Sequence, residues 1–167
     1  MSRVVFEKLI ALFDAGRARY RVMAHAPVRT SEEAAAVRGT VLSQGAKAMT
    51  CRVKLSAAQR VYVLAVLPAD QQLDFVKLAA AISGKKASLA TPEEAQALTD
   101  CEMGAVPPVS FHPELLLIAD PGIASQHSEI SFNAGLRERS IIVATEDYLR
   151  IVAPRLETIV RDGTVSP

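Results

Sequence analysis

Residues 46–67 read AKAMTCRVKLSAAQRVYVLAVL, in which two apolar runs, 46–53 and 61–67, stand on either side of a polar link. The second run is hydrophobic at successive positions, which is typical of a strand buried on both faces of a sheet. We therefore expect two adjacent, well-buried strands at the centre of the fold.

Helices and further strands surround this pair in irregular order. Helix signals are apolar residues at helical spacing, start residues such as Thr30-Ser31-Glu32-Glu33, and stops at glycine or proline. They predict helices over residues 3–15, 31–38, 71–83, 92–98 and 145–153. The third helix is expected to be capped by Asp70 and to bury Leu73, Val76, Ala80 and Ile82. Further strands are predicted over residues 17–24, 115–119, 130–132 and 140–144. Without regular βαβ repetition, this order indicates the α+β class.

The predicted architecture is one domain over residues 1–167, with a central mixed β-sheet or partial barrel of about seven strands flanked by helices. Residues 163–167 are expected to form a loose tail. The chain has 167 residues, half of them hydrophobic, which is enough for one ordinary core.

Composition excludes several classes of protein. Cys51 and Cys101 lie far apart without a CxxC motif, so we expect neither a zinc site nor a disulfide. A net charge of +1 does not fit a protein held to nucleic acid mainly by phosphate neutralisation. Charges interrupt the N-terminal MSRVVFEK and no apolar stretch could span a membrane, so we expect a reduced, cytoplasmic protein without signal peptide or membrane contact.

Lys47 is the most unusual side chain, since Ala46, Ala48 and Met49 surround it at the start of an apolar strand. The preceding glycines superficially resemble a phosphate-binding loop. Their spacing is one residue too long, and no serine or threonine follows the lysine, so we reject a nucleotide-hydrolysing loop. Two readings remain for Lys47: a lysine on the solvent face of the strand, or a cation directed into a cleft where an ester or phosphate binds.

Other catalytic signals are sparse. The three histidines, His25, His112 and His127, lie on separate loops without the spacing of metal ligands, and no GxSxG motif marks a serine nucleophile. Gly104 opens a rigid, proline-rich loop, so backbone amides there could approach a ligand and stabilise an oxyanion. A plain tight turn explains the same residues.

Six segments occur together in an order that resembles the YbaK/prolyl-tRNA-synthetase-associated editing domains. They are HAP (25–27), TSEEAA (30–35), GAKAM (45–49), VLAVLPAD (63–70), GAVPP (104–108) and FNAG (132–135). The resemblance extends from about residue 6 to residue 151 and is strongest to the freestanding, YeaK-like branch. It implies an α+β domain with trans-editing activity: hydrolysis of the ester between a small, wrong amino acid and the terminal adenosine of tRNA.

Carried onto this sequence, the resemblance makes Lys47 the catalytic lysine, holding the terminal phosphate or the ester. It makes Gly104 the glycine whose backbone orients the aminoacyl carbonyl. Further substrate contacts are expected at His25, Thr30, Ala105, Pro107, Asn133, Gly135 and Ser140. Asn133 and Ser140 fall on polar pocket positions that vary between branches, which favours serine-, threonine- or alanine-like substrates and leaves cysteine-like ones in range.

An aminoacyl ester is already activated, so orientation and oxyanion donors could suffice without a protein nucleophile, metal or organic cofactor. The expected partners are mischarged tRNA, through its acceptor end, and an aminoacyl-tRNA synthetase. The main alternative is a non-catalytic module of the same fold that binds tRNA or a synthetase. A DNA-binding regulator is disfavoured, because the charge is near neutral and no recognition-helix pattern is present.

Overall fold

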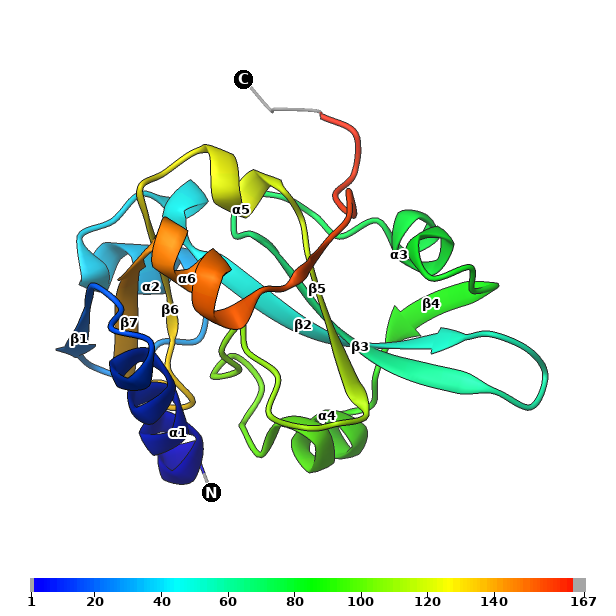
Figure 1. Cartoon of the computed structure of the whole chain (residues 1–167), viewed down its shortest axis with the longest axis horizontal. Helices are drawn as coiled ribbons and strands as arrows, with labels where there is room; N and C mark the ends of the chain where they lie inside the picture. Colours follow the sequence, from blue (N-terminus) through cyan, green and yellow to red (C-terminus); the bar gives the residue numbers. More distant parts are fainter. Residues whose placement is uncertain (1, 164–167) are drawn as a thin grey trace.

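The computed structural model describes residues 2–163, and the predicted pair of buried strands lies at its centre (Figure 1). β2 (Ala46–Lys54) and β3 (Arg60–Pro68) pair antiparallel. β4 (Lys86–Leu89) pairs antiparallel with β2, whereas β5 (Leu115–Ala119) pairs parallel with β3, and β8 (Arg155–Leu156) pairs parallel with β5. The order β4-β2-β3-β5-β8 makes this five-stranded sheet mixed, as predicted.

A second sheet has three antiparallel strands in the order β1-β7-β6: β1 (Tyr20–Ala24), β7 (Arg139–Ala144) and β6 (Glu129–Asn133). An isolated parallel bridge between Gly45 and Ser131 links the two sheets. The α+β prediction is confirmed, but the single central sheet becomes two sheets that do not close into a barrel. Hydrophobic periodicity along one strand indicates which of its faces is buried but not which strand it pairs with, so the division into two sheets could not be predicted from it.

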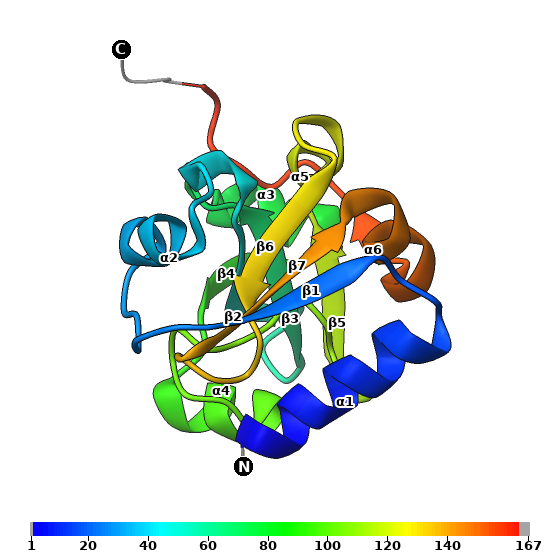
Figure 2. The same ribbon diagram turned by 90° about the vertical axis from the view of Figure 1, so that its left-hand side faces the viewer.

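The main core lies between the sheets, beneath α1 (Ser2–Ala15). Val5, Leu9 and Phe13 follow the predicted helical spacing and pack into the cluster that holds Phe132 of β6 and Ile141 of β7. Figure 2 shows α1 running alongside the three-stranded sheet. The opposite face of the five-stranded sheet packs against α3 (Phe75–Ala81), so β2 and β3 are covered on both sides.

Helix caps fix the segments that approach the site. Thr30 caps α2 (Ser31–Arg38) by accepting from the Glu33 amide at 3.1 Å, and Gly39 ends the helix with a φ of 69°. The Glu33 carboxylate accepts from the Thr30 hydroxyl, not from its amide as a capping box requires. α4 (Pro92–Thr99) has the complete box, and the remaining helical segments are η1 (Leu42–Gln44), α5 (Gly122–Ser125) and α6 (Thr145–Val152).

One predicted helix start is wrong. Asp70 does not cap α3, because the Gln71 amide donates to Pro68 O at 3.0 Å and this stretch forms a turn. Asp74 is the cap instead, accepting from the amides of Val76 and Lys77 at 2.9 and 3.0 Å. With that later start, Val76 is 80% exposed and Ala80 is exposed too, whereas the prediction placed both on the buried side.

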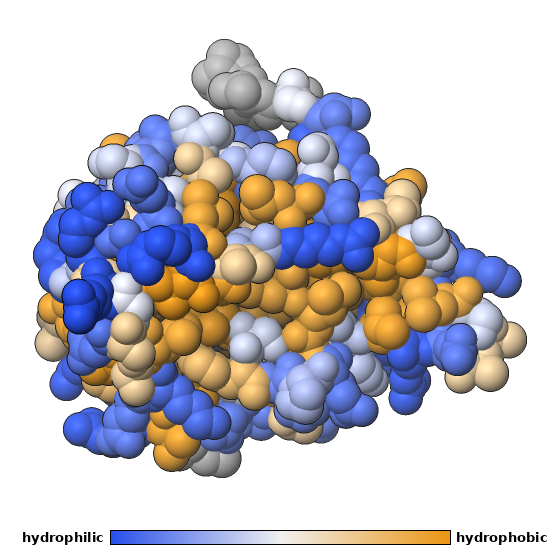
Figure 3. All heavy atoms as spheres, viewed as in Figure 1, coloured by the Kyte–Doolittle hydropathy of each residue, from blue (hydrophilic) through white to orange (hydrophobic). Residues whose placement is uncertain are grey.

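The surface shows a band of apolar atoms across the face seen in Figure 3. Two exposed leucines, Leu116 of β5 and Leu156 of β8, belong to neighbouring strands of the five-stranded sheet. No helix among residues 2–163 combines the length and apolar character needed to cross a membrane. Of the predicted tail 163–167, only Gly163 lies within the described residues.

Candidate active site

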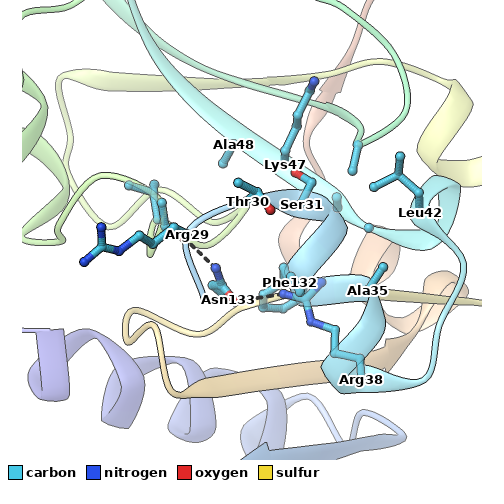
Figure 4. A pocket seen from close by; sticks show the side chains of 16 residues that line it. Arg29, Thr30, Ser31, Ala35, Arg38, Leu42, Lys47, Ala48, Phe132 and Asn133 are labelled. Carbon is cyan, nitrogen blue, oxygen red and sulfur yellow. Dashed lines mark hydrogen bonds between the residues drawn. The ribbon is translucent and has the colours of Figure 1, made fainter. Parts of the chain in front are cut away.

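A cavity of about 110 Å³ opens where α2, the start of β2, the Gly104 loop and the end of β6 meet (Figure 4). We call it the basic cavity, because the charged residues in its wall are Arg29, Arg38 and Lys47 and none of its lining residues is acidic. Polar groups come from Thr30, Ser31 and Asn133, and apolar ones from Phe132, Val106 and several alanines. Such a wall suits an anionic or strongly polar ligand.

Lys47 lines the basic cavity at the start of β2. Its ammonium donates to the Gln71 carbonyl at 2.5 Å, and in Figure 4 the side chain extends away from Asn133 and Arg38. Burial lowers the pKa of Lys47, and the nearby carboxylates of Glu32 and Asp70 partly oppose that shift. An ammonium has three donors, so one carbonyl contact leaves capacity to bind an anion at this end of the cavity.

Gly104 also lines the basic cavity, with a φ of 87°, a left-handed conformation that favours glycine. Its carbonyl accepts from the Asn133 side-chain amide at 2.5 Å. The Ala105 amide is occupied by Glu102 O at 3.0 Å. Among residues 2–163, the amides of Gly104 and Val106 donate no hydrogen bond, and both residues line the basic cavity, so these two amides are candidate oxyanion donors.

Arg38 was not singled out in the sequence, yet it organises one side of the basic cavity. It reaches from the end of α2 toward Asn133 (Figure 4) and donates to Asn133 Oδ1 at 2.9 Å, Ser140 Oγ at 2.8 Å and Ser131 Oγ at 3.3 Å. All three acceptors are neutral, and burial lowers the pKa of Arg38 to about 10. A basic residue in the last turn of a helix usually complements the helix dipole, so its position gave no sign of this role.

His25 and Ser140 do not line the basic cavity but lie behind Asn133. His25 Nδ1 donates to the Ala26 carbonyl at 2.8 Å, because a carbonyl can only accept. In the neutral ring Nε2 then accepts from the Ser140 hydroxyl at 2.7 Å, which in turn accepts from Arg38. These two predicted substrate contacts thus form a hydrogen-bonded support that holds the Arg38 guanidinium in place.

Three other predicted contacts also lie behind the cavity wall. Ala105 and Pro107 are buried and do not line the basic cavity. The Gly135 amide donates to Ala105 O at 2.9 Å, which fixes the loop against the turn between β6 and β7. The structure therefore brings Lys47, Gly104, Thr30 and Asn133 together in one wall and places His25, Ala105, Pro107, Gly135 and Ser140 outside it.

The cysteines lack the features of a nucleophile. Cys51 and Cys101 are both buried, and burial raises the pKa of each thiol to about 12, so both are protonated near neutral pH. Within residues 2–163, no three histidine, cysteine, aspartate or glutamate side chains gather as a metal site would require.

Comparison with known proteins gives a consistent family assignment. The chain is 48% identical over 153 residues to the multifunctional Ser/Thr-tRNA deacylase ProXp-y of Escherichia coli K12, covering 92% of this chain and 91% of that protein. A shorter segment of 64 residues is 31% identical to proline–tRNA ligase of Geobacillus thermodenitrificans, covering 38% of this chain and 11% of the ligase.

Two solved structures share the fold. Hypothetical protein APE2540 superposes with a TM-score of 0.80 at 22% identity, covering 92% of this chain and 99% of that one. A proposed trans-editing enzyme for prolyl-tRNA synthetase superposes with a TM-score of 0.75 at 19% identity, covering 95% and 98%. The model of the aminoacyl-tRNA editing domain family matches residues 25–151, so this chain belongs to that family.

Proposed function

We propose that the chain is a trans-editing deacylase, which hydrolyses the ester between the terminal adenosine of tRNA and a small, wrongly attached amino acid. The observation that carries this proposal is the basic cavity, where Lys47 and the free amides beside Gly104 line one small space. The 48% identity to a Ser/Thr-tRNA deacylase favours serine and threonine as the amino acids removed.

The size of the cavity supports a small aminoacyl group. At about 110 Å³ it lies well below the roughly 300 Å³ at which pockets for whole drug-sized ligands begin, so only part of a substrate fits inside. The Thr30 and Ser31 hydroxyls and the Asn133 amide offer hydrogen bonds to a substrate hydroxyl. A pocket that bonds a hydroxyl rejects analogues lacking one far more strongly than an apolar pocket separates methylenes.

The proposed reaction requires no covalent intermediate on the protein. Water attacks the acyl carbon, the amides of Gly104 and Val106 stabilise the negative charge that develops on the carbonyl oxygen, and the bond to the ribose oxygen breaks. The ribose oxygen leaves with a proton, which yields free amino acid and tRNA. The adjacent ribose hydroxyl helps to position the water, and Lys47 holds the terminal phosphate.

A panel of tRNAs charged with serine, threonine, alanine or proline tests the proposal, with Lys47→Ala as the variant and Lys54→Ala as its matched control at the exposed far end of β2. We expect wild type and Lys54→Ala to accelerate loss of seryl and threonyl esters. Lys47→Ala should lower kcat/KM by about tenfold or more, because it removes a charge-assisted contact to the terminal phosphate. Equal ester loss with and without protein would favour the non-catalytic binding module.

Association with a synthetase forms a second part of the proposal. The 31% identity over 64 residues to a proline–tRNA ligase favours prolyl-tRNA synthetase as the protein that delivers substrate. Adding that synthetase should raise kcat/KM for the mischarged tRNA, whereas an unrelated synthetase should not.

A further inference from the structure

A second, larger cavity adjoins the basic cavity on the other side of the Gly104 loop. We call it the α4 cavity; its volume is about 400 Å³, and its apolar wall includes Met49, Leu89, Pro92, Ala95 and Met103. It shares Ala48, Gly104 and Val106 with the basic cavity. A ligand whose carbonyl group lies at the Gly104 amide could therefore extend into both cavities.

The two volumes divide an aminoacyl-adenosine end unequally. The basic cavity accommodates a small amino acid and its ester, whereas the α4 cavity falls in the range of pockets that hold whole organic ligands. The remaining large part of the substrate is the nucleobase. The ester joins the amino acid to the ribose, and the ribose carries the base. The base therefore lies only a few bonds from the ester carbonyl, and it must lie near Gly104 when that carbonyl is bound there.

The wall of the α4 cavity has the chemistry that a flat aromatic base requires. Methionine side chains from β2 and from the Gly104 loop offer polarizable contacts to an aromatic face. Arg137 adds a guanidinium, which donates to Met103 O at 3.1 Å and pairs with Glu102 at 3.4 Å. Guanidinium planes and apolar side chains are common stacking partners of bases in single-stranded RNA.

Polar groups in the same wall remain available to the edge of a base. The side-chain oxygens of Gln96 and Glu102 can accept from an exocyclic amine, which adenine has and hypoxanthine lacks.

We propose that the α4 cavity binds the adenine base of the tRNA 3′ end while the basic cavity holds the esterified amino acid. This inference rests on the proposed deacylase function and extends it by assigning a site for the nucleobase. The Gly104 loop then separates the two parts of one substrate, and base binding places the ester carbonyl beside the free amides of that loop.

Binding of free nucleotides tests the site without any deacylation. AMP and IMP, which differ at one exocyclic group, are titrated into the full chain, and backbone amide shifts are followed by NMR. We expect AMP to shift the amides of Met49, Leu89 and Met103 and to bind about tenfold or more tightly than IMP, because the carboxylate of Glu102 accepts from the amine and repels a keto oxygen. Shifts confined to other surfaces, or equal binding of both nucleotides, would overturn the proposal.

Two leucine substitutions on α4 test the site in the reaction. Ala95→Leu fills the α4 cavity, whereas Ala97→Leu places the same side chain on the exposed face of the same helix. Alanine and leucine have similar helix propensity, so both variants should fold, which urea unfolding verifies. We expect Ala95→Leu to lower kcat/KM for seryl-tRNA by about tenfold or more, the scale of losing one base-stacking contact, with Ala97→Leu within about twofold of wild type.

The outcomes separate this inference from the proposed function. If wild type cleaves none of the mischarged tRNAs, the deacylase function fails, whatever AMP does. If wild type cleaves them but Ala95→Leu matches Ala97→Leu, the deacylase function stands and the nucleobase site fails.

Discussion

Gly104 combines a φ of 87° with open space around its missing side chain. A Cβ there would meet only the Arg29 carbonyl, at 3.9 Å, so Gly104→Ala introduces backbone strain and no clash. We predict a loss of about 1–2 kcal/mol in unfolding free energy, the usual cost of a left-handed alanine. Relaxation of the loop would also move its free amides and lower kcat by about tenfold. Urea unfolding and single-turnover deacylation measure the two effects.

Gly39→Ala is the matched control for that prediction. Gly39 ends α2 with a φ of 69°, and a Cβ there would meet nothing within 4 Å. The variant should lose a similar unfolding free energy, about 1–2 kcal/mol, while retaining most of the wild-type rate. A rate as low as that of Gly104→Ala would mean that lower stability alone explains the loss.

Arg38 offers a second prediction at this scale, because it orients Asn133, which in turn holds the Gly104 carbonyl. Arg38→Met removes three hydrogen bonds but also the cost of burying a cation without a carboxylate, so the net change in unfolding free energy should be small, about 1 kcal/mol. We expect kcat to fall about tenfold with little change in KM. Arg38→Lys should restore only part of kcat, since an ammonium cannot reproduce the planar set of donors.

A raised KM at unchanged kcat would contradict this positioning role of Arg38. That pattern would indicate an arginine that binds substrate directly and does not act through Asn133. Steady-state rates across a range of seryl-tRNA concentrations separate the two cases.

At the level of single residues, the sequence identified side chains that occur within recognisable segments. Lys47, Gly104, Thr30 and Asn133 came from motif segments, and the structure brings them into one wall. Arg38 stands outside every motif, and its three acceptors are 93 to 102 residues away in the chain. No local pattern can report such contacts, because they depend on how α2 packs against the second sheet.

Among the elements, the start of α6 is held to the residue before β1 by a buried carboxylate. Asp147 is 7% exposed and accepts from the Arg19 amide at 2.8 Å, from Arg19 Nε at 3.0 Å and from Arg150 at 3.3 Å. Hydrogen bonds from the Arg19 side chain and backbone lower the pKa of Asp147 well below its ordinary value of 3.8. The folded state therefore prefers the carboxylate, and this stabilisation is present above pH 3.8 and lost as the pH falls through the lowered pKa.

Asp147→Asn should accordingly lower the urea midpoint at pH 7, because the amide carries no charge to pair with Arg19. The difference from wild type should shrink as the pH falls below about 3.8, because the carboxyl group of the unfolded chain then takes up a proton that the folded state still excludes. Urea titrations at several pH values measure this. A difference that stays constant down to the acid limit would show that Asp147 contributes through packing and not through its charge.

Helices with strong end signals were predicted closely, whereas weakly patterned elements were missed. α2 and α4 begin and end within a residue or two of expectation, since threonine caps, proline and glycine act locally. β4 and β8 were not predicted, because they are short edge strands that gain their order by pairing with β2 and β5. α3 started late because Asp70 and Asp74 are both plausible caps, and only the turn after Pro68 separates them.

Across the whole molecule, the basic cavity lies at the junction of the two sheets. Lys47 belongs to the five-stranded sheet and Asn133 to the three-stranded one, and the Gly45–Ser131 bridge joins the sheets beside them. Sequence patterns predicted the strands but not this junction, because the relative placement of two sheets depends on packing between distant segments. The candidate site residues came from the resemblance to a known family, because periodicity indicates buried faces and not ligand contacts.

Positive charge is concentrated at the basic cavity, which predicts how tRNA binding depends on salt concentration. The net charge is +1, yet Arg29, Arg38 and Lys47 all line the basic cavity. Arg38 is engaged by neutral acceptors, which leaves Lys47 and the exposed Arg29 for phosphates of the single-stranded 3′ end. Each contact to a phosphate of single-stranded RNA contributes about −0.7 to the slope of log K against the logarithm of the salt concentration. Two such contacts predict a slope of about −1.4 for tRNA binding.

Fluorescence anisotropy with uncharged tRNA between about 50 and 200 mM salt measures that slope. Lys47→Ala should reduce its magnitude by about 0.7, the contribution of one phosphate, while Lys54→Ala should leave it unchanged. A slope steeper than about −4 in wild type would contradict local recognition, because it requires roughly six phosphate contacts spread over a broad basic surface. A protein with a charge of +1 can offer such a surface only if its acidic residues gather elsewhere, so the slope tests directly whether affinity comes from the cavity.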